Sequence, residues 1–258
     1  MDDTLKLKVS GPVATVTLSR PEAHNALDEC LAGNLAQAFQ KLSVADAVRV
    51  VLLESAGESF CAGADLGWMR RLAALDGADA QREAMMLAVV LDAIDRCAKP
   101  VIAVAQGAAL GLGAGMVAAA DMAIAADGAS FALTEVRMGL VPSLSTPYLV
   151  AAMGARACRR YLLTGERFDA REAVRLGLLH GVFPADKLAA ARDHLVDACL
   201  KGAPKAQADA KDMVRLVADT PAGPDLMRLA AARLASAAAA PEAGEGVAAA
   251  LEKRKPAW

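Results

Sequence analysis

Two glycine- and alanine-rich segments have the composition that brings backbone N–H groups close to a ligand. Residues 106–116 read QGAALGLGAGM and residues 60–66 read FCAGADL. Each segment follows a predicted strand and opens a predicted helix, and the first N–H groups of a helix have no acceptor within it. Such an N–H can stabilise an oxyanion that develops during a reaction, and two facing segments would supply a pair. For either segment alone, tight backbone packing is the competing interpretation.

The same glycine-rich segment partly matches the dinucleotide-binding fingerprint G-x-G-x-x-G. Gly111 and Gly113 fit its first half, but Met116 stands where the third glycine belongs. The turn between the predicted strand and Gly111 is also too long for that fold, and no lysine follows as a phosphate-binding loop requires. The sequence therefore disfavours a nucleotide site.

Glu135 is the candidate for acid–base chemistry, because it lies between apolar segments. Burial there would raise its pKa toward neutrality, which suits a general acid or base. The alternative is an exposed or salt-bridged glutamate near Arg137. Cys61 has no neighbouring base, so we expect a buried, unreactive thiol.

The elements that must position these residues alternate between strands and helices in the first part of the chain. Alternating apolar residues over 5–18 predict a hairpin, and Asp28 precedes a helical pattern as an N-cap. Short apolar runs at 48–53, 101–105 and 122–126 predict buried strands, and 79–98 has helical spacing. After Pro142 helices dominate, which indicates an α/β core followed by a helical tail. The predicted helices of this part are 155–163, 169–176, 186–200, 204–217, 225–237 and 242–253.

The composition points to a core built by close approach of backbones. Hydrophobic residues make up 55%, but 62 residues are alanine and only nine are aromatic. Alanine buries little area, so dense packing must come from short distances between elements. Residues 101–120 carry no charge and are long enough to span a bilayer. They contain few Leu, Ile or Phe residues, so we expect a buried strand, loop and helix instead.

Charge and residue usage exclude several classes of function. The net charge is −2 and no basic stripe occurs, which argues against nucleic acid as a partner. The acidic start Met1-Asp2-Asp3 predicts no signal peptide, and five scattered cysteines without C-x-x-C spacing predict reduced thiols in a cytoplasmic protein. No metal is expected, because the histidines lack ligand spacing. The histidines are His24, His180 and His194.

Four sequence strings occur in a fixed order along the chain. They are RPEAHNAL (20–27), FCAGADLGWM (60–69), KPVIAVAQGAALGLGAG (99–115) and FALTEVRMGLVPS (131–143). Together they resemble the enoyl-CoA hydratase/isomerase (crotonase) superfamily over nearly the whole chain. The resemblance implies an α/β fold, the crotonase (ClpP-like) spiral of ββα units with a C-terminal helical trimerisation region. We therefore expect a core with the acyl-CoA site over 1–190, an oligomerisation region over 191–258, and a homotrimer or a dimer of trimers.

The resemblance also implies an acyl-CoA thioester substrate and no separate cofactor, since coenzyme A is part of the substrate. It gives the two oxyanion-hole N–H groups to Ala64 and Leu112. Glu135 aligns with the second of two glutamates that hold a water molecule in hydratases, whereas Gly115 stands at the first. The remaining residues that it places around coenzyme A and the acyl group are Ala23, His24, Ala26, Ala62, Asp65, Leu66, Gly111, Thr134, Pro142 and Ser143.

Several interpretations stay open at this stage. We favour an enoyl-CoA hydratase, because FALTEVRMGLVPSLSTPY and GADLGWMRRLA most resemble the hydratases of 3-methylglutaconyl-CoA and isohexenylglutaconyl-CoA. A single carboxylate also suits an isomerase that moves a double bond from Δ3 to Δ2, and a third possibility is a non-catalytic acyl-CoA-binding protein. Ser143 and Ser145 are candidate contacts for water or substrate, with capping or turn roles as the alternative. His24 is a candidate contact for phosphate, with a solvated loop histidine as the alternative.

Overall fold

The chain forms two compact units, Met1–Val196 and Asp197–Trp258, in a computed structural model that describes residues 3–218 and 220–258. The predicted boundary at 190/191 lies within the first unit, and the division between the units falls inside helix α7 (Leu188–Leu200). The prediction of no signal peptide depends on Met1 and Asp2, which lie outside the described residues.

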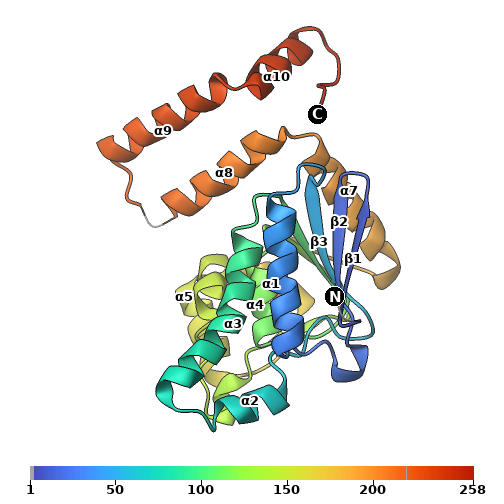
Figure 1. The fold of residues 1–258 in the computed structure, drawn as a ribbon, viewed down its shortest axis with the longest axis vertical. Coiled ribbons are helices and arrows are strands. Elements are labelled where there is room, and N and C mark those ends of the chain that lie inside the picture. Colours follow the sequence, from blue (N-terminus) through green and yellow to red (C-terminus); the bar gives the residue numbers. More distant parts are fainter. Residues whose placement is uncertain (1–2, 219) are drawn as a thin grey trace. The chain divides into compact units, whose positions relative to one another are not determined.

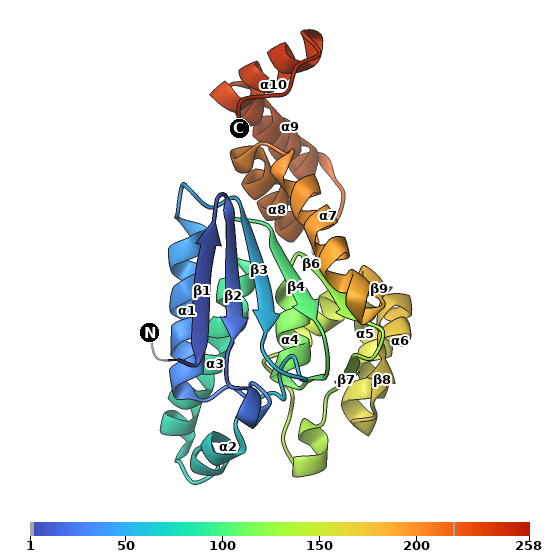
Figure 2. The ribbon, with the colours of Figure 1, turned by 90° about the vertical axis from the view of Figure 1, so that its right-hand side faces the viewer.

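A six-stranded sheet frames the first unit, with the strand order β1-β2-β3-β4-β6-β9 (Figure 2). β1 and β2 form the predicted antiparallel hairpin, which pairs Leu5 with Leu18, and every other neighbouring pair is parallel. All of β4 is buried, as expected for a parallel strand that is covered on both faces. The strands are β1 (Leu5–Ser10), β2 (Val13–Leu18), β3 (Val50–Ser55), β4 (Val101–Ala105), β6 (Met122–Ala126) and β9 (Gly181–Phe183).

Helices α1 (Glu29–Ser43) and α3 (Gly77–Asp95) pack against each other on one face of this sheet (Figures 1 and 2). Asp28 begins α1 as predicted, because its side chain accepts a 2.8 Å hydrogen bond from the backbone N–H of Leu31. Alanines on the buried face of α1 allow the short interhelical distances that the composition indicates. The other helices of this unit are α2 (Leu66–Leu72), α4 (Leu112–Ala119), α5 (Thr146–Thr164) and α6 (Ala170–Leu176).

Helix α5 begins earlier than the sequence pattern predicts. The predicted helix over 155–163 is the second part of an element that starts at Thr146 and is interrupted at Gly154, where φ is 77° and ψ is 154°. Pro147 hides the first part from sequence reasoning, although a proline in the first turn of a helix needs no N–H acceptor. The earlier start places the beginning of α5 next to α4, with which it packs.

A second, small sheet has the strand order β5-β7-β8 and was not predicted. Its strands are β5 (Ala109–Leu110), β7 (Ser130–Ala132) and β8 (Phe168–Asp169), and strands of two or three residues are too short to have a recognisable periodicity. The uncharged stretch 101–120 forms β4, a connection that contains β5, and α4. This agrees with the expected order of a buried strand, a loop and a helix. Among the described residues, none of the helices combines the length and the hydropathy needed to cross a bilayer.

Beyond the end of α7, the second unit consists of helices that each begin with proline in the first turn: α8 (Pro204–Val217), α9 (Pro224–Ala238) and α10 (Pro241–Leu251). The Glu242 carboxylate accepts hydrogen bonds from the backbone N–H groups of Lys205 and Ala206 at 3.0 and 3.1 Å, which joins the start of α10 to the start of α8. Arg254 pairs with Glu245 at the end of the chain. A role of this unit in forming a trimer stays a prediction.

Buried Asn25 joins two loops at the end of the sheet. Its side chain accepts a hydrogen bond from the Arg20 N–H at 2.9 Å and donates to the carbonyl oxygens of Ala56 and Ser59 at 2.8 Å each. The residue is fully buried and has a positive φ of 56°. The Arg20 N–H and the Ala56 oxygen would lose this partner without the amide, whereas the Ser59 oxygen also accepts from Ser55 and Gln106. Asn25 therefore fixes the loop that carries Ala23, His24 and Ala26.

We expect Asn25→Ala to lower the free energy of unfolding by about 3 kcal/mol, because buried backbone groups that lose a partner cost about 1–3 kcal/mol each. Urea denaturation of the full chain measures this loss. Asn25→Gly is the matched variant, since glycine accepts the positive φ without strain. A nearly equal loss in both variants supports the hydrogen bonds as the cause, and a wild-type stability of Asn25→Gly would contradict it.

Candidate active site

Three short parallel segments lie side by side where the site forms. Cys61 makes a parallel bridge with Ala109 of β5, and Ala109 pairs with Phe131 of β7. The Cys61 N–H donates to the Ala108 oxygen at 3.0 Å, which fixes the first of these pairings. Because parallel segments run in the same direction, the residues that follow them leave at the same edge. Both small-residue turns and the segment that carries Glu135 therefore converge at one place.

The predicted oxyanion-hole N–H groups are both free at this edge. Gly63 and Asp65 exchange 2.8 Å backbone hydrogen bonds with Leu27, so the intervening Ala64 points its own N–H to the opposite side. Leu112 is the first residue of α4, where an N–H has no acceptor within the helix. Neither N–H has a hydrogen-bond acceptor within the part of the chain that the structure describes. The two turns touch, since a Cβ on Gly63 would lie 3.6 Å from the Leu112 nitrogen.

The Glu135 carboxyl group fills the space that a side chain at position 111 would need. A Cβ on Gly111 would lie 2.5 Å from Oε1 of Glu135, and the φ of Gly111 is +51°, which favours glycine. Burial raises the pKa of Glu135, and its Oε2 is buried with no hydrogen-bond partner among the described residues. A carboxyl group in this environment can accept and return a proton closer to neutral pH than an exposed glutamate can.

Glu135 does not form the alternative salt bridge with Arg137. The Arg137 guanidinium instead donates two 3.4 Å hydrogen bonds to the carbonyl oxygen of Thr164. Among the described residues no ion pair includes Glu135. The carboxyl group therefore faces the cavity without a neutralising cation.

A cavity of about 520 Å³ opens beside Glu135, within the range of small-molecule sites. Every residue that the sequence analysis placed in the site lines it, including Ala64, Leu112 and Glu135. Their assigned contacts with coenzyme A or the acyl group stay predictions. The members of this group other than these three are Ala23, His24, Ala26, Ala62, Asp65, Leu66, Gly111, Thr134, Pro142 and Ser143.

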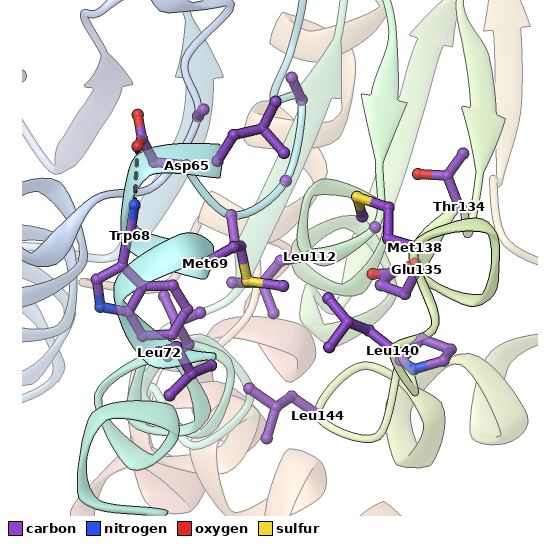
Figure 3. A pocket seen from close by; sticks show the side chains of 18 of the residues that line it. Asp65, Trp68, Met69, Leu72, Leu112, Thr134, Glu135, Met138, Leu140 and Leu144 are labelled. Carbon is purple, nitrogen blue, oxygen red and sulfur yellow. Dashed lines mark hydrogen bonds between the residues drawn. The ribbon is translucent and has the colours of Figure 1, made fainter. Parts of the chain in front are cut away.

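The remaining walls of the cavity are largely apolar, and the sequence analysis did not predict them. Figure 3 shows the side chains of α2 on one side, those that follow Glu135 on the other, and Leu112 between them. The Trp68 indole donates a 3.0 Å hydrogen bond to Glu83 of α3, which anchors the α2 wall. The helical spacing of apolar residues in α2 is the sequence signal that could have found this wall. The added wall residues are Trp68, Met69, Leu72, Met138, Leu140 and Leu144.

Two polar residues at the mouth have structural partners. Asp65 caps α2 by accepting from the N–H groups of Gly67 and Trp68 at 2.8 and 3.2 Å (Figure 3). The capping role fixes the chain direction directly after Ala64. Exposed His24 has a left-handed backbone, and its Nδ1 lies 3.1 Å from the Ser59 hydroxyl oxygen.

The chain is similar to known proteins over nearly its whole length. A model of the family described as enoyl-CoA hydratase/isomerase matches residues 8–258. A solved enoyl-CoA hydratase from Shewanella pealeana is 37% identical, with a TM-score of 0.96 over 99% of this chain and 96% of its own. One from Mycobacterium smegmatis is 33% identical, with a TM-score of 0.93 over 99% and 98%. A carnitinyl-CoA dehydratase from Proteus mirabilis is 34% identical over 100% of this chain and 99% of its own.

The raised pKa of Glu135 predicts a pH-dependent cost in stability. At a pH well below the ordinary pKa of 4.5, the Glu135 carboxyl group is protonated in both the folded and the unfolded protein. The residue then makes no pH-dependent contribution to the free energy of unfolding. As the pH rises through that value, the unfolded chain ionises more readily than the folded one, and the folded state loses stability. We expect Glu135→Gln to unfold at a higher temperature than the wild type at pH 8, with a difference that closes toward pH 4. Exposed Glu58→Gln is the control, and an equal gain there would contradict the assignment.

Proposed function

The chain belongs to the enoyl-CoA hydratase/isomerase family, and on that premise we propose that it adds water to the double bond of a 2-enoyl-CoA thioester. The observation that carries the proposal is the meeting of two free backbone N–H groups and one half-buried carboxyl group in a single cavity. The two N–H groups can stabilise an enolate oxygen, and the carboxyl group can move a proton between water and carbon.

In the proposed reaction the thioester oxygen accepts hydrogen bonds from the N–H groups of Ala64 and Leu112. The oxygen of a water molecule attacks Cβ, and the electron pair of the double bond moves toward the thioester oxygen. The Glu135 carboxylate takes a proton from that water and then delivers a proton to Cα as the thioester carbonyl forms again. The sum is the addition of H and OH across the double bond, and Glu135 ends in its starting state.

The lining of the cavity supports an uncharged acyl group as the substrate class. No lysine or arginine is among the described residues that line it, and most of its lining is apolar. Asp65 is paired with Arg20, whereas the unpaired Glu135 carboxylate would repel an anionic acyl chain. The subgroup resemblance indicates carboxylated glutaconyl-type substrates, and the wall chemistry favours the uncharged alternative.

An isomerase is the second candidate, favoured by the number of available carboxyl groups. Asp65 is occupied as a helix cap, which leaves Glu135 as the free carboxyl group among the described lining residues. One base that removes and returns a proton is sufficient to move a double bond. The names of the relatives, hydratases and a dehydratase, favour reactions that involve water.

We expect Glu135→Gln to lower kcat for crotonyl-CoA by about 10²–10⁴-fold, the usual contribution of a general acid or base. Acyl-CoA binding should be retained, because the amide has the same shape and the oxyanion-hole N–H groups belong to the backbone. Loss of the enoyl absorbance measures turnover, and calorimetry with butyryl-CoA measures binding. Glu58→Gln, exposed and outside the cavity, should keep the wild-type rate. Wild-type turnover by the Glu135 variant would contradict the proposed role.

A panel of crotonyl-, 3-hexenoyl- and 3-methylglutaconyl-CoA separates the candidate functions. We expect hydration of crotonyl-CoA with a kcat/KM at least about tenfold above that for the carboxylated 3-methylglutaconyl-CoA, a difference of about 1.4 kcal/mol. Conversion of 3-hexenoyl-CoA to its 2-enoyl isomer without any hydration would identify an isomerase instead. Binding of the whole panel without turnover would identify a non-catalytic protein. A preference for 3-methylglutaconyl-CoA would contradict the proposed uncharged substrate.

A further inference from the structure

Ser145 has a hydroxyl group on the cavity wall to which the proposed reaction gives no role. Among the described residues, Asn25 and Ser145 are the polar residues that are buried, and Ser145 is 2% exposed. The Asn25 amide has its hydrogen bonds, whereas the Ser145 hydroxyl has no partner within the described part of the chain. Unlike Oε2 of Glu135, the Oγ of Ser145 is not enclosed by protein atoms, so a water molecule in the cavity can reach it.

The structural alternative, a helix cap, does not explain the hydroxyl group. Ser145 precedes α5 but has helical dihedral angles, and its side chain makes no capping hydrogen bond. The neighbouring Thr146 makes the local contact instead, with its Oγ1 donating to the Pro142 oxygen at 2.8 Å. Ser145 lines the active-site cavity, so its hydroxyl group can find a partner there.

The Ser145 hydroxyl group lies next to Gly115, and the Glu135 carboxyl group lies next to Gly111, four residues earlier in the chain. A Cβ on Gly115 would lie 2.4 Å from Oγ of Ser145, as a Cβ on Gly111 would lie 2.5 Å from Oε1 of Glu135. Gly111 is the N-cap residue of α4 and has non-helical dihedral angles, and the Gly115 N–H donates to its oxygen at 3.1 Å, so the two glycines lie one helical turn apart. One turn of a helix rises by about 5.4 Å.

That spacing suits one water molecule between the carboxyl and hydroxyl groups. A water with hydrogen bonds of about 2.8 Å to two oxygens bridges a separation of about 5–6 Å or less. We propose that Ser145 and Glu135 together hold the water that adds to Cβ, with the hydroxyl group in place of a second carboxylate at position 115. The proposal rests on the hydratase function. Ser145 binds the water and exchanges no proton in net terms, while Glu135 accepts the proton and passes it to Cα.

The test separates water binding from proton removal. We expect Ser145→Ala to lower kcat for hydration of crotonyl-CoA by about 10²-fold, the usual effect of a misplaced reactant. The exchange of the α-proton of butyryl-CoA in D₂O needs Glu135 and the oxyanion hole alone, so it should stay at the wild-type rate. Ser236→Ala, which removes an exposed hydroxyl group from α9, should leave both rates unchanged. The melting temperature of Ser145→Ala should not fall, because the hydroxyl group has no partner to lose.

Three results would overturn the proposal. Wild-type hydration by Ser145→Ala would show that the hydroxyl group is not needed, and the hydratase function would stand. An equal loss of hydration and exchange would show a structural role. A wild-type protein that exchanges the α-proton but hydrates no enoyl-CoA would overturn the hydratase function, and with it the role of Ser145.

A second pair of variants tests the position of the hydroxyl group. Alanine at 115 would bring its Cβ within 2.4 Å of Oγ and 2.9 Å of Cβ of Ser145, so Gly115→Ala should displace the side chain and lower both stability and hydration. Gly115→Ala combined with Ser145→Gly removes the overlap. We expect the double variant to recover its melting temperature without recovering hydration. Recovery of hydration in the double variant would contradict a direct role of the hydroxyl group.

Discussion

The parallel pairing of three short segments at Cys61, Ala109 and Phe131 is the constraint on which the site depends. Each pairing lasts only a few residues, yet it fixes the direction in which three loops leave the sheet edge. Two of these loops present a free N–H, and the third presents Glu135. Hydrogen bonds between backbones hold this arrangement, so side chains here need only be small. The high alanine and glycine content is therefore partly a property of the active site as well as of the core.

The partial burial of the Glu135 side chain affects both the proposed acid–base function and the free energy of unfolding, because it raises the pKa of the carboxyl group. The apolar walls of the cavity remove water from the carboxyl group, which raises its pKa, and the proposed function uses the same walls for an acyl group. Arg137 is close in sequence, but its hydrogen bonds to the Thr164 oxygen keep its charge away. A salt bridge would have lowered the pKa of Glu135 and stabilised the fold, at the loss of a group able to return a proton.

Two glycines at the beginning of helix α4 make room for side chains from other segments. Gly111, the N-cap, and Gly115, one turn later, leave two spaces, which the Glu135 carboxyl group and the Ser145 hydroxyl group occupy. Both groups come from the residues between β7 and the first turn of α5, so the position of that segment against α4 sets their spacing. The missing carboxylate at 115 thus leaves the space that Ser145 fills.

The sequence by itself determined the elements that local physics controls. The hairpin over 5–18, the Asp28 cap and the helices predicted over 204–217, 225–237 and 242–253 follow from periodicity and capping, and the last two begin one residue earlier than predicted, at a proline. The family motifs led to the residues that line the cavity. Only the tertiary structure decided the pairings of β5, β7 and β8, the direction of the Ala64 N–H and the isolation of the Ser145 hydroxyl group. These depend on contacts between segments far apart in the chain, and a strand of two residues has no pattern that its sequence could reveal.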